Sequence, residues 1–323
     1  MSKNRSGNVL ISSAAKKIPL LQAVRQALAK LDNKGKIIIA DQDEKCLTRY
    51  FADDFWQMPL LDKITPEKLL SNLQQYGVRY VIPTRDGELL FWSECKAYLE
   101  KHGIAVMVAE SESIKRCLDK VLFYQICKQL SIPAIETESS LDGLNAEWFV
   151  VKERYGAGSH HIGLKLSSEQ AKLHACQLSY PIFQPFVRGR EYSADAYVNK
   201  QGQIQGIVCR SRDIVVNGES QVTTTVKNTV LEELCAHYIG RLGLYGHVVL
   251  QVLVDEQGHM AIIECNARFG GASTMSIAAG LDSFYWFLLE SRGENLQQYP
   301  FCRLEQQLRQ IRYPQDLIME VTQ

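Results

Sequence analysis

A predicted β-hairpin gathers side chains that carry oxygen atoms. Residues 247–268 alternate between apolar and polar types on both sides of an Asp-Glu-Gln-Gly turn, which predicts two antiparallel strands. If Glu256 faces His259 across the turn, counting back places Gln251 opposite Glu264. Directly opposed residues have Cβ atoms about 4.5 to 5.5 Å apart. The hairpin therefore brings an amide and a carboxylate together.

The second strand of this hairpin has one polar and one apolar face, because side chains two residues apart point to the same side. The two faces carry Glu264, Asn266 and Arg268, and Ile263, Cys265 and Ala267. Carboxylate and amide oxygens suit Mg²⁺, which takes one or two carboxylates together with phosphate oxygens. A solvated strand face with an incidental ion pair between Glu264 and Arg268 is the simpler alternative.

Two glycine-rich segments favour anion binding near such a cation. Residues 270–273 (Gly-Gly-Ala-Ser) lead into an apolar helical stretch, and a glycine-rich entry to a helix N-terminus binds anions. Lys152 ends a predicted strand, 147–152, and is followed by Gly156-Ala157-Gly158-Ser159. An ammonium and open backbone N–H groups there can meet phosphate oxygens. The segment is no Walker loop, because no Gly-Lys-Ser/Thr follows.

Other polar residues near these motifs carry less information. His160 and His161 are adjacent, yet no third ligand has suitable spacing, so we interpret them as loop histidines rather than metal ligands. A predicted strand, 191–198, places Glu191, Ser193 and Asp195 on one face. A polar cleft and an exposed edge would both produce that pattern.

The elements before these motifs predict an α/β domain with a parallel sheet. Strands are expected at 8–12, 36–40 and 79–83, and helices at 20–31 and 66–76. A nicotinamide oxidoreductase would need glycines in the first strand-to-helix turn. That turn, residues 12–17, has none, so we interpret Asp41 as an ordinary end of a strand.

The predicted secondary structure changes after about residue 112, from alternating strands and helices to one helix followed mainly by strands and turns. A helix is expected over 114–130, capped by Ser111 or Ser113 and ending before Ile132-Pro133. Further strands are expected at 147–152, 181–187, 191–198, 203–210 and 248–267. The prediction is an N-terminal α/β domain over 1–112, followed by an α+β unit with a small lobe, 113–183, and a large lobe with a C-terminal extension, 184–323.

Composition bounds the class of protein. The 323 residues suit about two domains, and 46% apolar with 22% charged residues indicate a folded protein. A formal net charge of zero gives no overall preference for nucleic acid or anionic lipid. With no signal-like start and no apolar run near the roughly 18 residues of a membrane span, we expect a cytoplasmic protein without a membrane partner. Nine cysteines without a Cys-x-x-Cys spacing predict reduced, mostly buried thiols.

Taken together and in this order, the motifs resemble the ATP-grasp superfamily, most closely a single synthetase unit of the carbamoyl phosphate synthetase large subunit. The most specific match is Gln251 followed by residues 262–268, Ile-Ile-Glu-Cys-Asn-Ala-Arg. The resemblance implies that ATP lies between the two lobes. It also implies a set of ATP-binding residues: Lys120 and Lys152 at the phosphates, Gly156, Gly158 and Ser159 in a mobile loop, the backbone of Gln184, Phe186 and Val187 at the adenine, and Glu191 at the ribose.

The same resemblance implies the metal ligands and the catalytic cations. Gln251, Glu264 and Asn266 would bind Mg²⁺ or Mn²⁺, and Arg268 would stabilise the transferring phosphoryl group. Arg210 would add a second positive charge. The family usually has proline where this chain has Glu153 and Ala267, a departure that concerns the subfamily rather than the chemistry.

The implied activity is that of an ADP-forming carboxylate-amine ligase that works through an acyl phosphate. Its expected partners are a small carboxylate, with amino acids among the candidates, and an amine. The chain has room for one such unit, which argues against carbamoyl phosphate synthesis in two ATP steps. A catalytically silent ATP-binding module is the alternative function. The oligomeric state stays open, with a homodimer among the options, because the apolar run 284–289 suits a core helix or an interface.

Overall fold

The computed structural model describes residues 7–31, 34–156 and 161–320, and its first domain is built on a parallel sheet. Five strands follow the order β3-β2-β1-β4-β5. They are β1 (Asn8–Ser12), β2 (Ile37–Asp41), β3 (Asp54–Gln57), β4 (Val78–Pro83) and β5 (Ala105–Val106). The expected parallel sheet is confirmed. The sequence reading missed β3 and β5, which are short strands at the two sheet edges.

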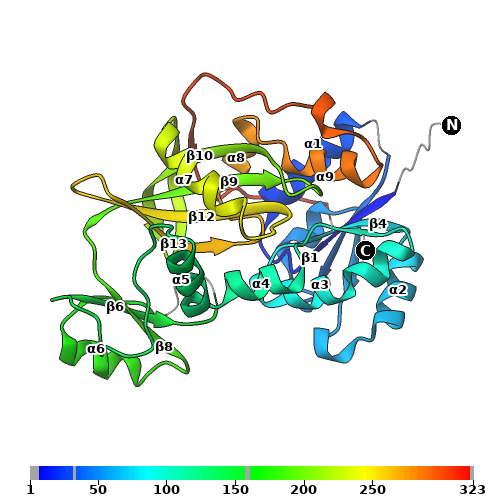
Figure 1. Cartoon of the computed structure of the whole chain (residues 1–323). Coiled ribbons are helices and arrows are strands. Elements are labelled where there is room, and N and C mark those ends of the chain that lie inside the picture. The colour runs from blue at the N-terminus through cyan, green and yellow to red at the C-terminus, as the bar shows by residue number, and fades with distance from the viewer. Residues whose placement is uncertain (1–6, 32–33, 157–160, 321–323) are drawn as a thin grey trace.

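Helices surround this sheet, which lies to the right in Figure 1. They are α1 (Ile18–Lys30), α2 (Pro66–Gln75) and α3 (Asp86–Lys101), with short 3₁₀ turns η1 (Leu47–Phe51) and η2 (Leu61–Lys63). Helix α3 was not predicted. Its start is held by Glu88, whose Oε1 accepts the backbone N–H groups of Thr84 and Arg85 at 2.7 and 3.0 Å, so a carboxylate in the first turn occupies N–H groups that have no helical partner.

The helix expected over 114–130 is two helices, α4 (Ser111–Leu118) and α5 (Lys120–Gln129). Asp119 between them is extended, with φ −99° and ψ 104°, and its side chain caps α5 by accepting the N–H groups of Val121 and Leu122. The predicted caps are also wrong. Glu110 is the N-cap residue of α4, and Ser113 donates its hydroxyl to the carbonyl of Leu242 instead.

A small lobe follows, at the lower left of Figure 1. Its sheet has the order β7-β6-β8, formed by β6 (Phe149–Glu153), β7 (Gly163–Leu166) and β8 (Pro181–Pro185), and α6 (Ser168–Ala175) packs against it. The lobe has a core of its own, made by Leu144, Phe149, Val151, Ala171 and Phe183. It is therefore a separate packing unit.

The large lobe is built on an antiparallel sheet with the order β13-β12-β9-β10-β11-β14. The strands are β9 (Gly189–Val198), β10 (Ile204–Val216), β11 (Glu219–Val226), β12 (Gly246–Asp255), β13 (Met260–Asn266) and β14 (Arg309–Ile311). The helices are α7 (Thr229–Ile239), α8 (Thr274–Ala278), α9 (Ser283–Ser291) and the 3₁₀ turn η3 (Leu296–Gln298). The expected α+β unit with two lobes is confirmed, whereas its residue boundaries stay a prediction.

The hairpin of β12 and β13 pairs Gln251 with Glu264, as predicted. The predicted faces are also present, because Cys265 and Ala267 are buried while Glu264, Asn266 and Arg268 are partly exposed on the other side.

The turn of this hairpin differs from the prediction by one residue. His259 lies opposite Asp255 rather than Glu256, since the N–H of Asp255 donates to the His259 carbonyl at 3.0 Å. Ile263 has no partner in the register and forms a β-bulge, so the pairing beyond it returns to the predicted one and Gln251 lies opposite Glu264. The bulge also turns Ile263 out of the core, and Ile262 is fully buried in its place.

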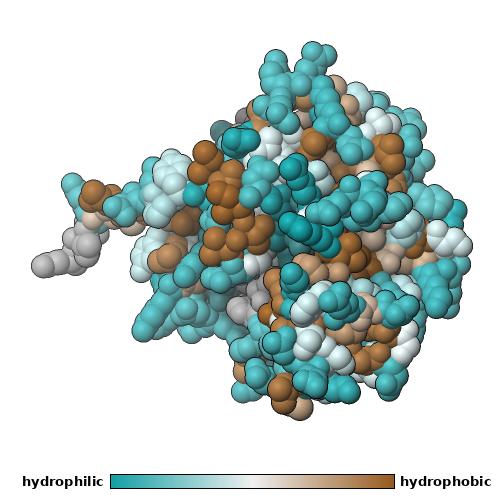
Figure 2. Space-filling view, turned by 90° about the vertical axis from the view of Figure 1, so that its left-hand side faces the viewer, coloured by the Kyte–Doolittle hydropathy of each residue, from teal (hydrophilic) through white to brown (hydrophobic). Residues whose placement is uncertain are grey.

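One continuous core joins the first domain to the large lobe. Helix α9 packs against α1, as Figure 1 shows, and its residues Phe284, Phe287 and Leu288 are almost fully buried. The run 284–289 is therefore a core helix. Figure 2 shows a face on which polar residues predominate and apolar residues form separate patches.

Two further expectations concern the whole chain. All nine cysteines are free thiols, seven of them buried, and the exposed ones are Cys176 and Cys302. No helix in the described ranges has both the length and the apolar character that crossing a membrane requires.

Candidate active site

The hairpin places the three predicted metal ligands in one hydrogen-bonded group. Gln251 Nε2 and Asn266 Nδ2 both donate to Glu264 Oε1, at 2.8 and 3.1 Å. Glu264 Oε2 accepts no hydrogen bond from any described residue. One carboxylate oxygen is thus held by two amides, and the other is left to bind a ligand.

The charge of Glu264 is maintained by neighbouring cations. Burial opposes ionisation, but Lys152 and Lys120, helped by Asn266 and Arg268, outweigh it and lower the pKa of the Glu264 carboxyl. The carboxylate is therefore ionised at neutral pH, as a metal ligand must be.

Lys152 is the most unusual cation of the site. It ends β6, and only 7% of its surface is exposed. Its ammonium makes no hydrogen bond or ion pair with any residue in the described part of the chain. Burial, and secondarily the charge of Lys120, lowers the pKa of Lys152, while Glu264 acts in the opposite direction. A buried ammonium without an acceptor is unfavourable, so this position is suited to an anionic ligand.

Lys120 lies beside Lys152 and contacts the glycine-rich segment. It is the first residue of α5, and its Nζ donates to the Gly156 carbonyl at 2.9 Å. Gly156 has φ +99°, which favours glycine, and nothing lies within 4 Å of the position of a Cβ. Gly158, Ser159 and His160 lie outside the described residues. His161 accepts a hydrogen bond from His174 through its backbone carbonyl, in agreement with a loop role.

Arg268 is held by an aspartate of the first domain. Its Nε and NH2 donate to the two carboxylate oxygens of Asp86 at 2.8 and 2.5 Å, and its NH2 also lies 3.3 Å from Asn266 Oδ1. The sequence reading missed Asp86. A signal was present, because Asp86 follows a predicted parallel strand at its carboxyl end, where such sheets bind ligands.

Lys17 is a second residue of the first domain near Arg268. Its ammonium donates to the carbonyl and, at 2.8 Å, to the hydroxyl of Thr84. Burial, followed by the charge of Arg268, lowers the pKa of Lys17 to about 8, against the opposing effect of Glu88 and Asp86. No sequence motif marked this lysine.

Arg210 is buried and forms an ion pair with Asp195. Its Nε donates to Asp195 Oδ2 at 2.7 Å, and Asp195 also contacts His247 and Ser273. Burial opposes the charge of Asp195, but Arg210 and His247 hold its pKa below the usual range. Arg210 lies near the segment after β13, because its NH2 is 3.9 Å from where a Cβ at Gly270 would be. Its catalytic role stays a prediction.

Glu191 lies next to an arginine that the sequence reading did not single out. Arg212 Nε is 3.3 Å from Glu191 Oε2, and the Arg212 side chain is only 7% exposed. Burial lowers the pKa of Arg212, while the charges of Glu191 and Glu264 raise it. Arg212 is thus a further cation near the hairpin.

The segment expected to contact adenine ends β8. Gln184 is buried and donates from Nε2 to Thr137 at 2.7 Å. The N–H of Phe186 donates to the Trp148 carbonyl at 2.7 Å, so it is already occupied. The N–H of Val187 makes no backbone hydrogen bond with a described residue.

A narrow pocket lies where these elements meet. Its lining includes Asp86, Lys120, Gly156, Glu264, Asn266 and Ala267. The pocket therefore joins two of the predicted metal ligands and one of the two predicted phosphate lysines to Asp86 of the first domain. No group of three His, Cys, Asp or Glu residues suited to a metal occurs within the described ranges. One carboxylate with amide oxygens still fits Mg²⁺, which takes its other ligands from phosphate and water.

Comparison with known proteins agrees with this architecture. A family model described as "ATP-grasp in the biosynthetic pathway with Ter operon" matches residues 179–314, and a model described as "PylC-like, N-terminal domain" matches residues 9–107. Most of the large lobe thus matches an ATP-grasp model. The resemblance inferred from the hairpin residues is confirmed at this level.

Three solved structures share the fold of this chain. The biotin carboxylase domain of Hydrogenobacter thermophilus 2-oxoglutarate carboxylase, in complex with MgADP and bicarbonate, has a TM-score of 0.71 at 16% identity, over 91% of this chain and 71% of that one. N5-carboxyaminoimidazole synthetase from Staphylococcus aureus, complexed with ADP, has a TM-score of 0.70 at 17% identity, over 90% of this chain and 78% of that one. L-amino acid ligase from Bacillus licheniformis has a TM-score of 0.67 at 15% identity, over 90% of this chain and 75% of that one. No curated protein matches the sequence.

Proposed function

We propose that this protein is an ATP-dependent, ADP-forming ligase that joins a small carboxylate to an amine through an acyl phosphate. The observation that carries the proposal is Lys152, a buried ammonium without an acceptor among the described residues, placed beside Lys120 and the ionised Glu264. This arrangement suits a polyphosphate and its metal. The names of the ATP-grasp neighbours, which include ligases and a complex with MgADP, support the same chemistry.

The described residues divide the work between binding and charge stabilisation. Lys152 and Lys120 would bind the phosphate oxygens of ATP, while Gln251, Glu264 and Asn266 would hold Mg²⁺. When bound, the metal neutralises phosphate charge and orients the terminal phosphoryl group. Arg268, fixed by Asp86, would stabilise the charge that develops on this group.

The reaction needs no nucleophile from the protein. A carboxylate oxygen of the substrate forms a bond to the γ-phosphorus while the bond to the bridging oxygen breaks, and ADP leaves. The amine nitrogen then attacks the carbonyl carbon of the acyl phosphate. Phosphate leaves with the former carboxylate oxygen, and the amine loses a proton. The site must therefore bind ATP, the carboxylate and the acyl phosphate, which are all anions. Its lysine and arginine side chains suit this task.

The first domain would shape the pocket for the substrates. Asp86 and Lys17 lie at the carboxyl end of its sheet and face Arg268. A carboxylate and an ammonium there can select a substrate that carries the opposite charges. We propose amino acids as the substrate class on this basis.

The test measures ADP release over a grid of carboxylates and amines, with and without Mg²⁺. Wild-type protein should release ADP only with Mg²⁺ and a matching pair. Lys152→Met and Glu264→Gln should each reduce the rate at least about 100-fold, the loss typical of a charge-stabilising group. Lys165→Met, which removes an exposed lysine of the same lobe, is the matched control. Full activity in either site variant, or ATP binding without ADP from any pair, would contradict the proposal.

A further inference from the structure

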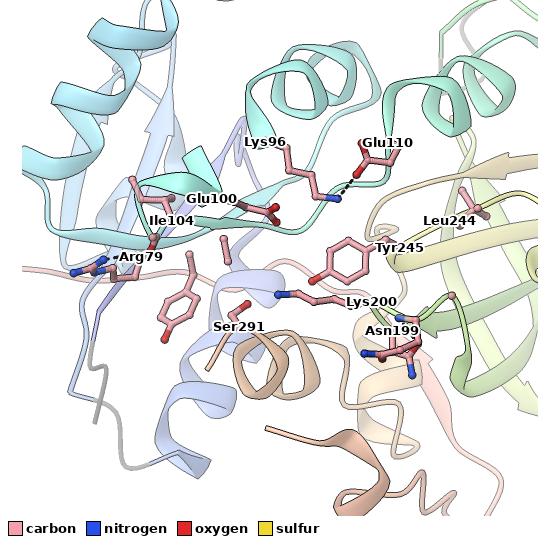
Figure 3. A pocket seen from close by; sticks show the side chains of 16 residues that line it. Arg79, Lys96, Glu100, Ile104, Glu110, Asn199, Lys200, Leu244, Tyr245 and Ser291 are labelled. Atoms are coloured by element: carbon pink, nitrogen blue, oxygen red, sulfur yellow. Dashed lines mark hydrogen bonds and ion pairs between the residues drawn. The ribbon is translucent and has the colours of Figure 1, made fainter. Parts of the chain in front are cut away.

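A second cavity, of about 650 Å³, lies between the first domain and the large lobe. Figure 3 shows its walls, which come from α3, the start of β4, the turn between β9 and β10, the segment before β12 and the end of α9. None of its lining residues lines the pocket at Glu264. Helix α3 contacts both places, with Asp86 at one end and Glu100 near the other, which are about 20 Å apart at 1.5 Å per residue.

The charges around this cavity are partly neutralised and partly open. Lys96 pairs with Glu110 at 2.7 Å and lies over the ring of Tyr245, 5.0 Å from its centre. By contrast, the carboxylate of Glu100 and the ammonium of Lys200 form no ion pair with a described residue. An unpaired anion of the first domain and an unpaired cation of the large lobe, as far as the described residues go, thus face the cavity.

Tyr245 lies in the cavity wall next to these charges. Its hydroxyl is buried, with the Tyr197 hydroxyl as a neighbour, and makes no hydrogen bond of normal length within the described ranges. The nearest acid on that side, Glu290, is already occupied by the Tyr197 hydroxyl at 2.7 Å and the Lys200 N–H at 2.8 Å. Burial, and then the charges of Glu290 and Glu100, raises the pKa of Tyr245, which therefore stays a donor.

Figure 3 shows the Tyr245 hydroxyl pointing toward the Lys200 side chain, with Glu100 across the cavity. A carboxylate beside Lys200 would receive a charge-assisted hydrogen bond from its ammonium. An amino group at the other end of the same molecule would meet Glu100. The volume lies within the range of small-molecule sites, about 300 to 1,000 Å³.

We propose that this cavity binds a small zwitterion with one carboxylate and one amino group, of the class of α-amino acids and dipeptides. The ligand joins the two domains, because Glu100 belongs to the first and Lys200 and Tyr245 to the large lobe. It also contacts elements that reach the candidate active site. Tyr245 directly precedes β12, which carries Gln251, and α3 begins at Asp86. Occupancy is therefore expected to raise the melting temperature.

The test titrates the standard L-amino acids and their alanine dipeptides into the full chain, without ATP or Mg²⁺, by calorimetry and thermal shift. At least one probe should bind saturably and raise the melting temperature. Lys200→Ala and Glu100→Gln should each raise its Kd about tenfold or more, as expected for loss of a charged partner. Lys101→Ala, an exposed neighbour on α3, should leave the Kd unchanged. Circular dichroism checks that each variant is folded, and Lys200→Gln replaces any variant that is not.

Arg268→Met separates this site from the candidate active site, because an amino acid could also bind there as a substrate. Binding at the cavity survives Arg268→Met and is weakened by the two cavity variants. The proposal is overturned if no probe binds, if the cavity variants bind as wild type does, or if only Arg268→Met abolishes binding. The proposal is also overturned if acetate binds as tightly as the amino-acid probe and its Kd is the same in wild type and Glu100→Gln, because the site would then recognise an anion alone.

Discussion

Asp86→Asn tests whether the first domain holds Arg268 in place. Asp86 receives two charge-assisted hydrogen bonds from Arg268, and the two side chains are only 11% and 17% exposed. A hydrogen bond to a charged group is worth about 1.5 to 3 kcal/mol. Asparagine keeps the shape and one acceptor, so we expect a loss of about 2 kcal/mol in the free energy of unfolding.

Activity should fall as well, because Arg268 would no longer be fixed beside Asn266. A misplacement of this kind can cost about 100-fold in rate, and we expect between 10- and 100-fold in kcat. Urea denaturation measures the stability change, and ADP release measures the rate. Glu112→Gln, which breaks the exposed pair with Lys115, is the matched control and should change neither measurement.

A double-mutant cycle with Arg268→Met isolates the interaction between the two side chains. The coupling in stability should be about 2 kcal/mol. Additive effects of the two substitutions, within about 0.5 kcal/mol, would refute the reasoning that Asp86 acts through Arg268.

Two further predictions concern pH and a helix cap. Because the folded-state pKa of Lys17 is about 8 rather than 10.5, the unfolded chain binds more protons between these values, and stability from this group rises with pH across the interval. The free energy of unfolding of the wild type, minus that of Lys17→Met, should rise by up to about 3 kcal/mol from pH 8 to pH 10.5. Denaturation midpoints that differ by the same amount at every pH would exclude this. Asp119→Ala removes the cap of α5 and the pair with Arg154, and should cost about 2 to 3 kcal/mol. Asp119→Asn keeps the cap and should cost about half as much; equal losses in the two variants would show that the cap contributes nothing.

Much of the candidate site was predictable because its residues lie on one hairpin. Alternation alone placed Gln251 opposite Glu264. The turn was predicted wrongly by one residue, and the bulge at Ile263 compensated. A bulge has no clear signal in alternation, since it depends on how the strand bends against its neighbours.

The residues that sequence reasoning missed act over long separations in the chain. Asp86 meets Arg268 across 182 positions, which requires the docking of two domains. The break between α4 and α5 has a similar origin, because Asp119 is also fixed by Arg154, 35 residues away. The family resemblance implied that Arg210 lies near the γ-phosphate, whereas its pairing with Asp195 follows only from the alignment of β9 and β10.

The proposed reaction activates a carboxylate as an acyl phosphate, and this step can be followed by isotope labelling. The most direct measurement uses the substrate pair found by the ADP screen, with ¹⁸O in both oxygens of the carboxylate, and mass spectrometry of the released phosphate. An acyl phosphate transfers one labelled oxygen to each phosphate formed, so we expect singly labelled phosphate together with ADP. Unlabelled phosphate, or AMP and pyrophosphate in place of ADP, would contradict it.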